Sequence, residues 1–194
     1  MSAIGIESHS GWAALVVLAG PVGAPAVVLR RRVELADPTD QAAKQPFHAA
    51  EDLPWPEAKA FIAAAVSDAR RRAREELDAV LHALASEQFS PRRCGIVTAS
   101  GRALPDLRSI LASHALIHAA EGEHFRKALA EAAESRGVAP VRISRKELPE
   151  RAAAAIGISA KEAVRRVSSF GAALGPPWAS DQKLAAMAAW IALR

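Results

Sequence analysis

The chain has 194 residues, 51% of them hydrophobic and 24% charged, a composition that supports a buried core and excludes disorder throughout. Its one cysteine, Cys94, excludes an internal disulfide and a cysteine-rich metal centre. No apolar run approaches the roughly 18 residues of a membrane span, and the first residues lack the pattern of a secretory signal, so we expect a cytoplasmic protein with no membrane partner.

The first 35 residues predict three β-strands in a meander. Apolar and β-branched residues fill the ranges 3–7, 12–19 and 25–35, and Gly20-Pro21-Val22-Gly23 is a turn signal between the last two. The first strand ends in Glu7, which small turn residues follow. A carboxylate at a strand end can hold a divalent cation or meet a polar substrate. It can also simply mark the point where the chain reaches water, and the residues alone leave both interpretations open.

The rest of the chain predicts helices that alternate with two further strands. Residues 36–54 contain Pro38 and Pro46 and predict a mobile connection, of a length that often covers a site. From Ala58 to Leu84, apolar residues recur every three or four positions, which is typical of a long amphipathic helix. Strands are expected at 94–99 and 138–143, and helices at 104–112, 114–136, 145–154, 160–173 and 181–193. This order predicts one α/β domain, residues 1–194, whose mixed sheet carries helices on both faces.

The positive charge is concentrated in arginines. The chain has 25 Lys and Arg against 21 Asp and Glu, a net charge of +4 and a pI of about 9.7. Arginine suits bidentate contact with phosphate, which favours a nucleic-acid partner. Against this, four Trp, five Phe and no Tyr offer little for base stacking, so solvated helix and strand faces explain the charge equally well. The clusters are Arg30-Arg31-Arg32, Arg70-Arg71-Arg72 with Arg74, Arg92-Arg93 and Arg165-Arg166.

Two parts of the sequence resemble RuvC-type junction resolvases of the ribonuclease-H-like superfamily. The first is Ile4-Gly5-Ile6-Glu7 with the small-residue turn that leads to Gly11-Trp12. The second runs from Val141 through Ser159-Ala160-Lys161-Glu162 to Asp181, which opens an Ala-rich helix. The resemblance implies a ribonuclease-H-like mixed sheet, an antiparallel three-strand meander plus parallel strands. It also implies three or four clustered carboxylates that bind two Mg²⁺ ions for phosphodiester cleavage.

The resemblance places two acids directly and shows where the chain departs from the family. Glu7 corresponds to the first-strand acid, which is usually Asp in the family, and Asp181 corresponds to the acid of the terminal helix. One turn later, Leu184 stands where the family has a second Asp. The loss of this ligand puts ordinary two-metal catalysis in doubt, because two close divalent ions need several carboxylates for charge balance. Asp181 also suits the first turn of a helix for electrostatic reasons alone.

The third carboxylate that the resemblance implies is the hardest to assign, because the strand expected at 94–99 ends without an acidic residue. Glu121 is the substitute we expect. On a helix, His114, His118 and Glu121 stand at i, i+4 and i+7 and share a face with Ile117 and Phe125. These three side chains can complete the metal site or bind a transition metal alone. Alternatively, the histidines hydrogen-bond Glu121 within the core.

The sequence therefore predicts a metal-dependent nuclease that acts on structured DNA or RNA. We expect Glu7, Glu121 and Asp181 to converge and, with His114, to hold Mg²⁺ or Mn²⁺, while His118 assists proton transfer. Nucleic acid is expected to contact basic residues near this site, or these residues make only surface ion pairs. The main alternative is a binding or assembly module of the same fold whose site has decayed, and a homodimer stays open. The basic residues are Arg102, Arg145, Lys161 and Arg165.

Overall fold

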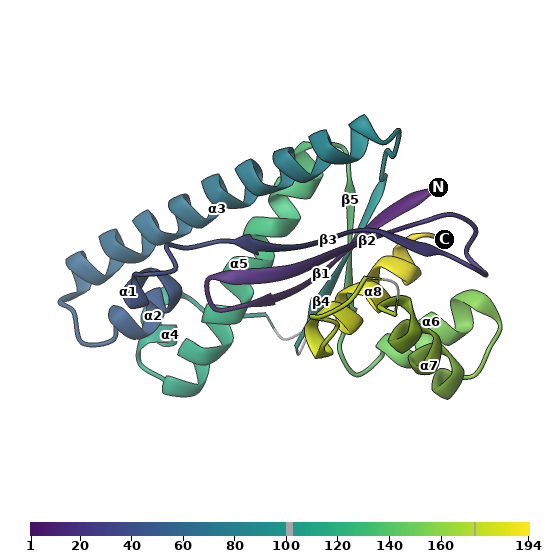
Figure 1. Ribbon diagram of the computed structural model, residues 1–194. Coiled ribbons are helices and arrows are strands. Elements are labelled where there is room, and N and C mark those ends of the chain that lie inside the picture. The colour runs from purple at the N-terminus through teal and green to yellow at the C-terminus, as the bar shows by residue number, and fades with distance from the viewer. Residues whose placement is uncertain (100–102, 173) are drawn as a thin grey trace.

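The computed structural model describes residues 1–99, 103–172 and 174–194, and a five-stranded mixed sheet forms its centre (Figure 1). The strand order is β3-β2-β1-β4-β5. The first three strands pair antiparallel, whereas β4 runs parallel to β1 and β5 runs parallel to β4. The predicted meander and parallel strands are thus confirmed. The strands are β1 (Ser2–His9), β2 (Trp12–Ala19), β3 (Ala26–Glu34), β4 (Arg93–Thr98) and β5 (Ala139–Ser144).

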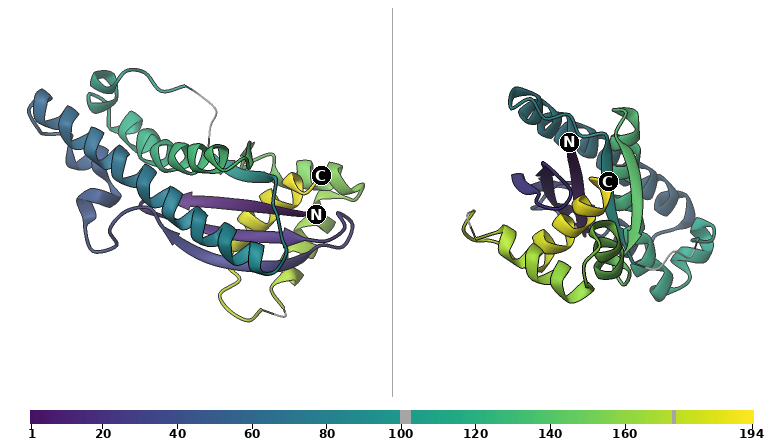
Figure 2. Two further views of the ribbon diagram at one scale, coloured as in Figure 1. Left: turned by 90° about the horizontal axis from the view of Figure 1, so that it is seen from above. Right: turned by 90° about the vertical axis from the view of Figure 1, so that its right-hand side faces the viewer.

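Helices cover both faces of the sheet, as expected. One face packs against α3 (Trp55–Ser86) and α5 (His114–Ser135). The other face packs against α6 (Leu148–Ile156), α7 (Ala160–Phe170) and α8 (Ser180–Ala192). Figure 2 shows the long α3 and α5 on one side of the strands and the yellow α8 on the other. Within the described residues, no helix combines the length and the apolar character that a membrane span requires.

Residues of β1 alternate between these two faces. Ile4 and Ile6 are buried in the core that contains α3 and α5, whereas Ala3 is buried in the core that contains α8. Successive side chains of a strand point to opposite faces, so Glu7 projects to the α8 side. The start of α8 and the end of β1 therefore share one side of the sheet.

Two glycines let α8 lie directly on the backbone of the sheet. A Cβ atom on Gly5 would lie 1.9 Å from the carbonyl oxygen of Ala185, and one on Gly95 would lie 2.3 Å from that of Ala188. No side chain fits in either place. Small residues on both surfaces thus fix the height of α8 above β1 and β4, and with it the position of the acid in its first turn.

The predicted mobile connection contains two short helices instead, α1 (Gln41–Lys44) and α2 (Pro46–Ala49). Phe47 and Ala50 are buried in a small core with residues of α3 and α5, which explains why this segment takes a defined path. The next short helix, α4 (Leu107–Leu111), begins later than predicted because the Asp106 side chain accepts hydrogen bonds from the backbone N–H groups of Arg108 and Ser109.

Candidate site at the ends of the central strands

Glu7 lies near the carboxyl end of β1 and is almost fully buried, with 6% of its surface exposed. Its carboxylate accepts a 2.6 Å hydrogen bond from Arg145, which directly follows β5. The Arg145 side chain is 52% exposed, so it pairs with Glu7 and is also open to solvent. A buried carboxylate thus holds a cation in a fixed position at the edge of the sheet.

Neighbouring groups and burial shift the pKa of Glu7 in opposite directions. Burial raises the pKa of Glu7 above its ordinary value, and the nearby charge of Asp181 raises it further. Arg145 and His9 act in the opposite direction and favour the carboxylate. Glu7 and Asp181 are thus close enough to interact electrostatically.

Asp181 in the first turn of α8 lies beside a row of aromatic and basic side chains. Its Oδ1 atom is 3.1 Å from Nε2 of His9. The His9 ring stacks on Trp12 with a centroid distance of 4.5 Å, and the Arg32 guanidinium lies 3.8 Å from the centroid of the Trp12 ring. This row connects α8 to the ends of β1, β2 and β3. Asp181 therefore faces an imidazole in place of a second carboxylate.

Glu7, His9 and Arg145 border a pocket of about 250 Å³. Its lining includes two guanidinium groups, those of Arg145 and Arg126, and the buried Glu7 carboxylate, with which Arg145 pairs. Arg126 comes from α5 and also pairs with Glu123, which in turn pairs with Arg142. An oxyanion suits such a surface better than a bare cation does. The pocket is lined by Glu7, Ser8, His9, Val97, Thr98, Ala99, Arg126 and Arg145.

The positions that would carry further metal-binding acids hold other residues. Leu184 packs against the core beneath α8, as its apolar side chain requires. β4 ends at Thr98, which is polar but uncharged. Within the described residues, Glu7 and Asp181 are thus the two acids that the structure brings together here, each beside a basic side chain.

Glu121 lies in a different environment from the other two predicted acids. It belongs to α5, on the opposite face of the sheet from α8, and its side chain is 5% exposed. Its Oε1 atom accepts hydrogen bonds from the backbone N–H groups of Phe47 and His48. No hydrogen bond or ion pair among the described residues joins it to Glu7 or Asp181. The structure therefore divides the three acids between two places.

The histidines of α5 do not contact Glu121 as the alternative interpretation expects. His114 and His118 are exposed and lie 3.1 Å apart at their Nε2 atoms. The residue that pairs with Glu121 is His48 of α2, whose Nδ1 atom is 3.1 Å from Oε1. Our sequence reasoning missed His48 because it lies in a segment that carries no periodic pattern, 73 residues away from Glu121. It also missed Arg126, whose only signal was its place on a long helix.

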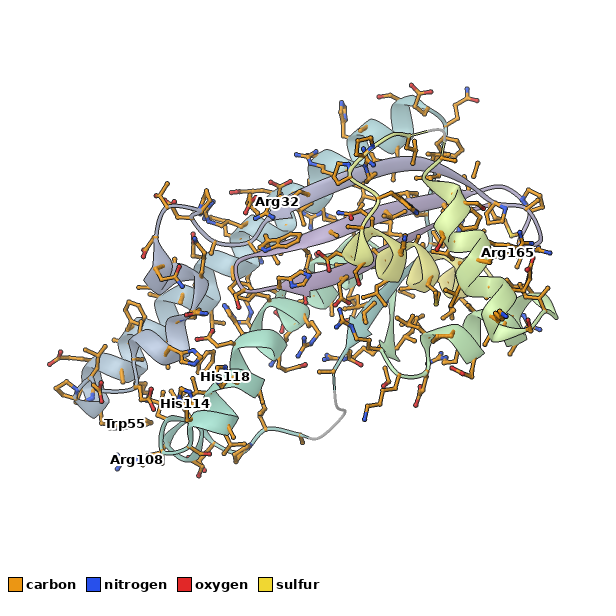
Figure 3. All side chains as sticks on the ribbon, turned by 60° about the horizontal axis from the view of Figure 1, so that its bottom comes forward. Arg32, Trp55, Arg108, His114, His118 and Arg165 are labelled. Carbon is orange, nitrogen blue, oxygen red and sulfur yellow. The ribbon has the colours of Figure 1, made fainter. Side chains whose placement is uncertain are left out.

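The predicted nucleic-acid contacts lie in different parts of the fold. Arg145 borders the pocket, as described, and Arg102 lies outside the described residues. Lys161 and Arg165 are exposed on α7. Arg165 makes a bidentate ion pair with Glu162, and together with Arg166 it lowers the pKa of that carboxyl to about 2. Figure 3 shows Arg165 far from the His114 and His118 end of the molecule.

Comparison with solved structures identifies the fold. A structure described as T. thermophilus RuvC in complex with Holliday junction substrate superposes with a TM-score of 0.55 and 16% sequence identity, over 98% of this chain and 91% of that chain. A second Thermus thermophilus RuvC structure gives the same TM-score and identity over 98% and 92%. No protein-family model and no curated protein matches the sequence. The protein has a RuvC-like, ribonuclease-H-like fold, which confirms the resemblance found in its sequence.

Proposed function

We propose that this protein binds structured nucleic acid through the pocket at the ends of β1, β4 and β5, where Arg145 and Arg126 take a backbone phosphate. The observation that carries the proposal is the charge of this pocket, whose lining includes the Arg145 guanidinium, paired with the buried Glu7 carboxylate, and the Arg126 guanidinium. The fold adds support, because a RuvC structure with this fold has been solved with a Holliday junction substrate. Lys161 and Arg165 are further candidate contacts on the α7 surface.

Each part of the pocket has a separate task in this proposal. The Glu7 carboxylate orients the Arg145 guanidinium and limits its motion, so less conformational entropy is lost when a phosphate arrives. Arg126 offers a second donor group from α5, and Glu123 holds it from the other side. Phosphate contacts of this kind fix the position of a duplex but do not read its sequence. The protein should therefore recognise the shape of a nucleic acid more than its sequence.

Binding to a labelled four-way DNA junction and to a linear duplex of equal length tests the proposal. We expect wild type to prefer the junction, and Arg145→Ala to weaken binding about tenfold, the loss of one charge-assisted contact. Arg71→Ala removes an exposed arginine from α3, outside the pocket, and should change affinity less than twofold. Glu7→Gln should retain binding, because the amide oxygen can still accept the hydrogen bond from Arg145 and a negative charge is removed. Equal affinity of wild type and Arg145→Ala would refute the proposal.

The second candidate function is phosphodiester cleavage with Mg²⁺ or Mn²⁺, favoured by the closeness of Glu7 and Asp181. The side chains present do not fit a pair of metal ions, because Leu184 and Thr98 occupy the positions of further ligands and Arg145 and His9 already contact the two acids. One ion would have two carboxylates and would have to displace Arg145. Metal-stimulated cleavage that Glu7→Gln or Asp181→Asn abolishes would select this candidate over binding alone.

A further inference from the structure

Three histidines from two helices converge at the far end of α5. His48 comes from α2. His114 and His118 lie one turn apart on α5 (Figure 3). One ring nitrogen from each histidine lies within 4.8 Å of the others. The ring centroids are 4.6 to 5.3 Å apart. The sequence analysis grouped His114 and His118 with Glu121, whereas the structure groups them with His48.

The spacing of the His114 and His118 ring nitrogens matches a tetrahedral metal centre. Two ligands about 2.0–2.1 Å from a tetrahedral ion stand roughly 3.3 Å from one another. Nε2 of His114 and Nε2 of His118 are 3.1 Å apart. Two histidines at i and i+4 share one helix face, and a third histidine from a separate segment completes three of the four positions. His114 and His118 are exposed, so the fourth position faces solvent.

Carboxylates stand behind two of the three rings. Oε1 of Glu121 pairs with Nδ1 of His48, which leaves Nε2 of that ring as the free ligand atom. Oε1 of Glu51 lies 3.7 Å from Nδ1 of His114, again away from the atom that faces His118. Metal-binding histidines commonly present their second nitrogen to a carboxylate, which fixes the tautomer and strengthens the ligand. The cluster shows this arrangement at His48, and at His114 a carboxylate lies nearby on the corresponding side.

Glu121 itself lacks a full set of partners. It is buried, and its Oε2 atom has no hydrogen-bond partner among the described residues. Its Oε1 atom meets two backbone N–H groups and the His48 ring, none of which carries a permanent charge. A buried carboxyl oxygen without a hydrogen-bond partner is stabilised by a nearby cation. A dication on the other side of the His48 ring would supply that charge.

We propose that His48, His114 and His118 form a binding site for a divalent transition metal of the zinc class, which ties α2 to the start of α5. Three imidazoles suit such an ion, whereas Mg²⁺ prefers oxygen ligands, so the site is chemically separate from the Glu7 pocket. It goes beyond the proposed nucleic-acid binding and does not depend on it. Its direct effect is to hold the 41–50 segment on α5.

The test uses the full chain, freed of metal by chelation and then titrated with Zn²⁺ or Co²⁺ alone. We expect one equivalent of Zn²⁺ to survive dialysis, and Co²⁺ to give the intense visible absorption of a four-coordinate site. The His114→Ala and His48→Ala variants should each bind at least about 100-fold more weakly. Glu121→Gln should bind about 10- to 100-fold more weakly, because it changes only the outer partner.

A matched control separates this site from adventitious binding. His82 is an exposed histidine on α3, outside the cluster, and His82→Ala should bind metal as wild type does. His114 is an exposed side chain, so its variant should fold normally and keep the test valid if His48→Ala does not fold. Failure to retain one equivalent of metal, or equal retention in His114→Ala and wild type, would overturn the proposal.

Discussion

The Arg145 guanidinium donates a hydrogen bond to the Glu7 carboxylate over 2.6 Å, although 138 residues separate the two in the chain. This pair joins the ends of β1 and β5, and β4 lies between those strands in the sheet. It places a cation where the resemblance to RuvC-type resolvases leads one to expect a metal ion. The pair is the reason why we assign phosphate binding to this pocket ahead of two-metal catalysis.

The first prediction concerns the salt dependence of nucleic-acid binding. Each phosphate contact releases counterions from the nucleic acid, so its removal flattens the plot of log affinity against log salt concentration. Arg145→Ala should reduce the slope by about one, and the double variant with Arg126→Ala should reduce it by about two. Anisotropy titrations at four salt concentrations measure the slopes. A slope unchanged in the double variant would show that neither guanidinium touches phosphate.

The second prediction concerns stability and pH. Burial raises the pKa of Glu7, so the folded protein accommodates the protonated form better than the charged form; stability is lost as the pH rises from the ordinary value of 4.5 to the raised value, and the cost is constant above it. Glu7→Gln, which stays neutral, should therefore be more stable than wild type at pH 7, by about 1 kcal/mol. The difference should shrink as the pH falls towards and below 4.5, where wild type is protonated too. Urea unfolding at several pH values measures this stability difference. A stabilisation by Glu7→Gln that increases as the pH falls would contradict a raised pKa for Glu7.

The third prediction concerns the contact between α8 and the sheet. Gly5→Ala would place a methyl group 1.9 Å from the Ala185 carbonyl oxygen, so α8 would have to move. We expect a loss of about 3 kcal/mol in unfolding free energy. A Cβ atom on Gly23 meets nothing within 4 Å, so Gly23→Ala should change stability by less than about 0.5 kcal/mol. Similar denaturation midpoints for the two variants would show that α8 does not rest on the strand backbone.

The fourth prediction concerns Leu184, which stands where RuvC-type resolvases have a second Asp. Leu184→Asp adds a carboxylate three residues after Asp181, on the same face of α8. It should tighten Mn²⁺ binding at least tenfold at a cost of about 2 kcal/mol in stability, because the leucine is partly buried. The neutral Leu184→Asn variant is the control. Electron paramagnetic resonance of free Mn²⁺ measures the affinity, and equal values for the two variants would place Leu184 outside the site.

Much of the fold could be predicted from the sequence because its signals are local. Alternation and apolar runs located the strands of the sheet, the three- and four-residue periodicity located α3, and helical composition located α5. The resemblance brought Glu7 and Asp181 to the same side of the sheet, where the structure also places them. These features depend on patterns within one element or on short motifs, so no knowledge of tertiary contacts was needed.

The partners of the candidate site could not be predicted in the same way. Helical spacing put Glu121 and the histidines of α5 on one face, but it could not show that α5 covers the opposite face of the sheet from α8. The segment that supplies His48 has no periodic pattern, and it is held by residues distant in the chain, through the core around Phe47 and the hydrogen bonds to Glu121. Arg126 and Arg145 likewise meet at the pocket through the topology of the sheet, which a spacing rule does not encode.

A structure of the protein bound to a four-way DNA junction tests the central claim most directly. Our account predicts a backbone phosphate within hydrogen-bond distance of the Arg145 or Arg126 guanidinium, with Glu7 still paired to Arg145. A junction seated elsewhere, with the pocket free of phosphate, would contradict it.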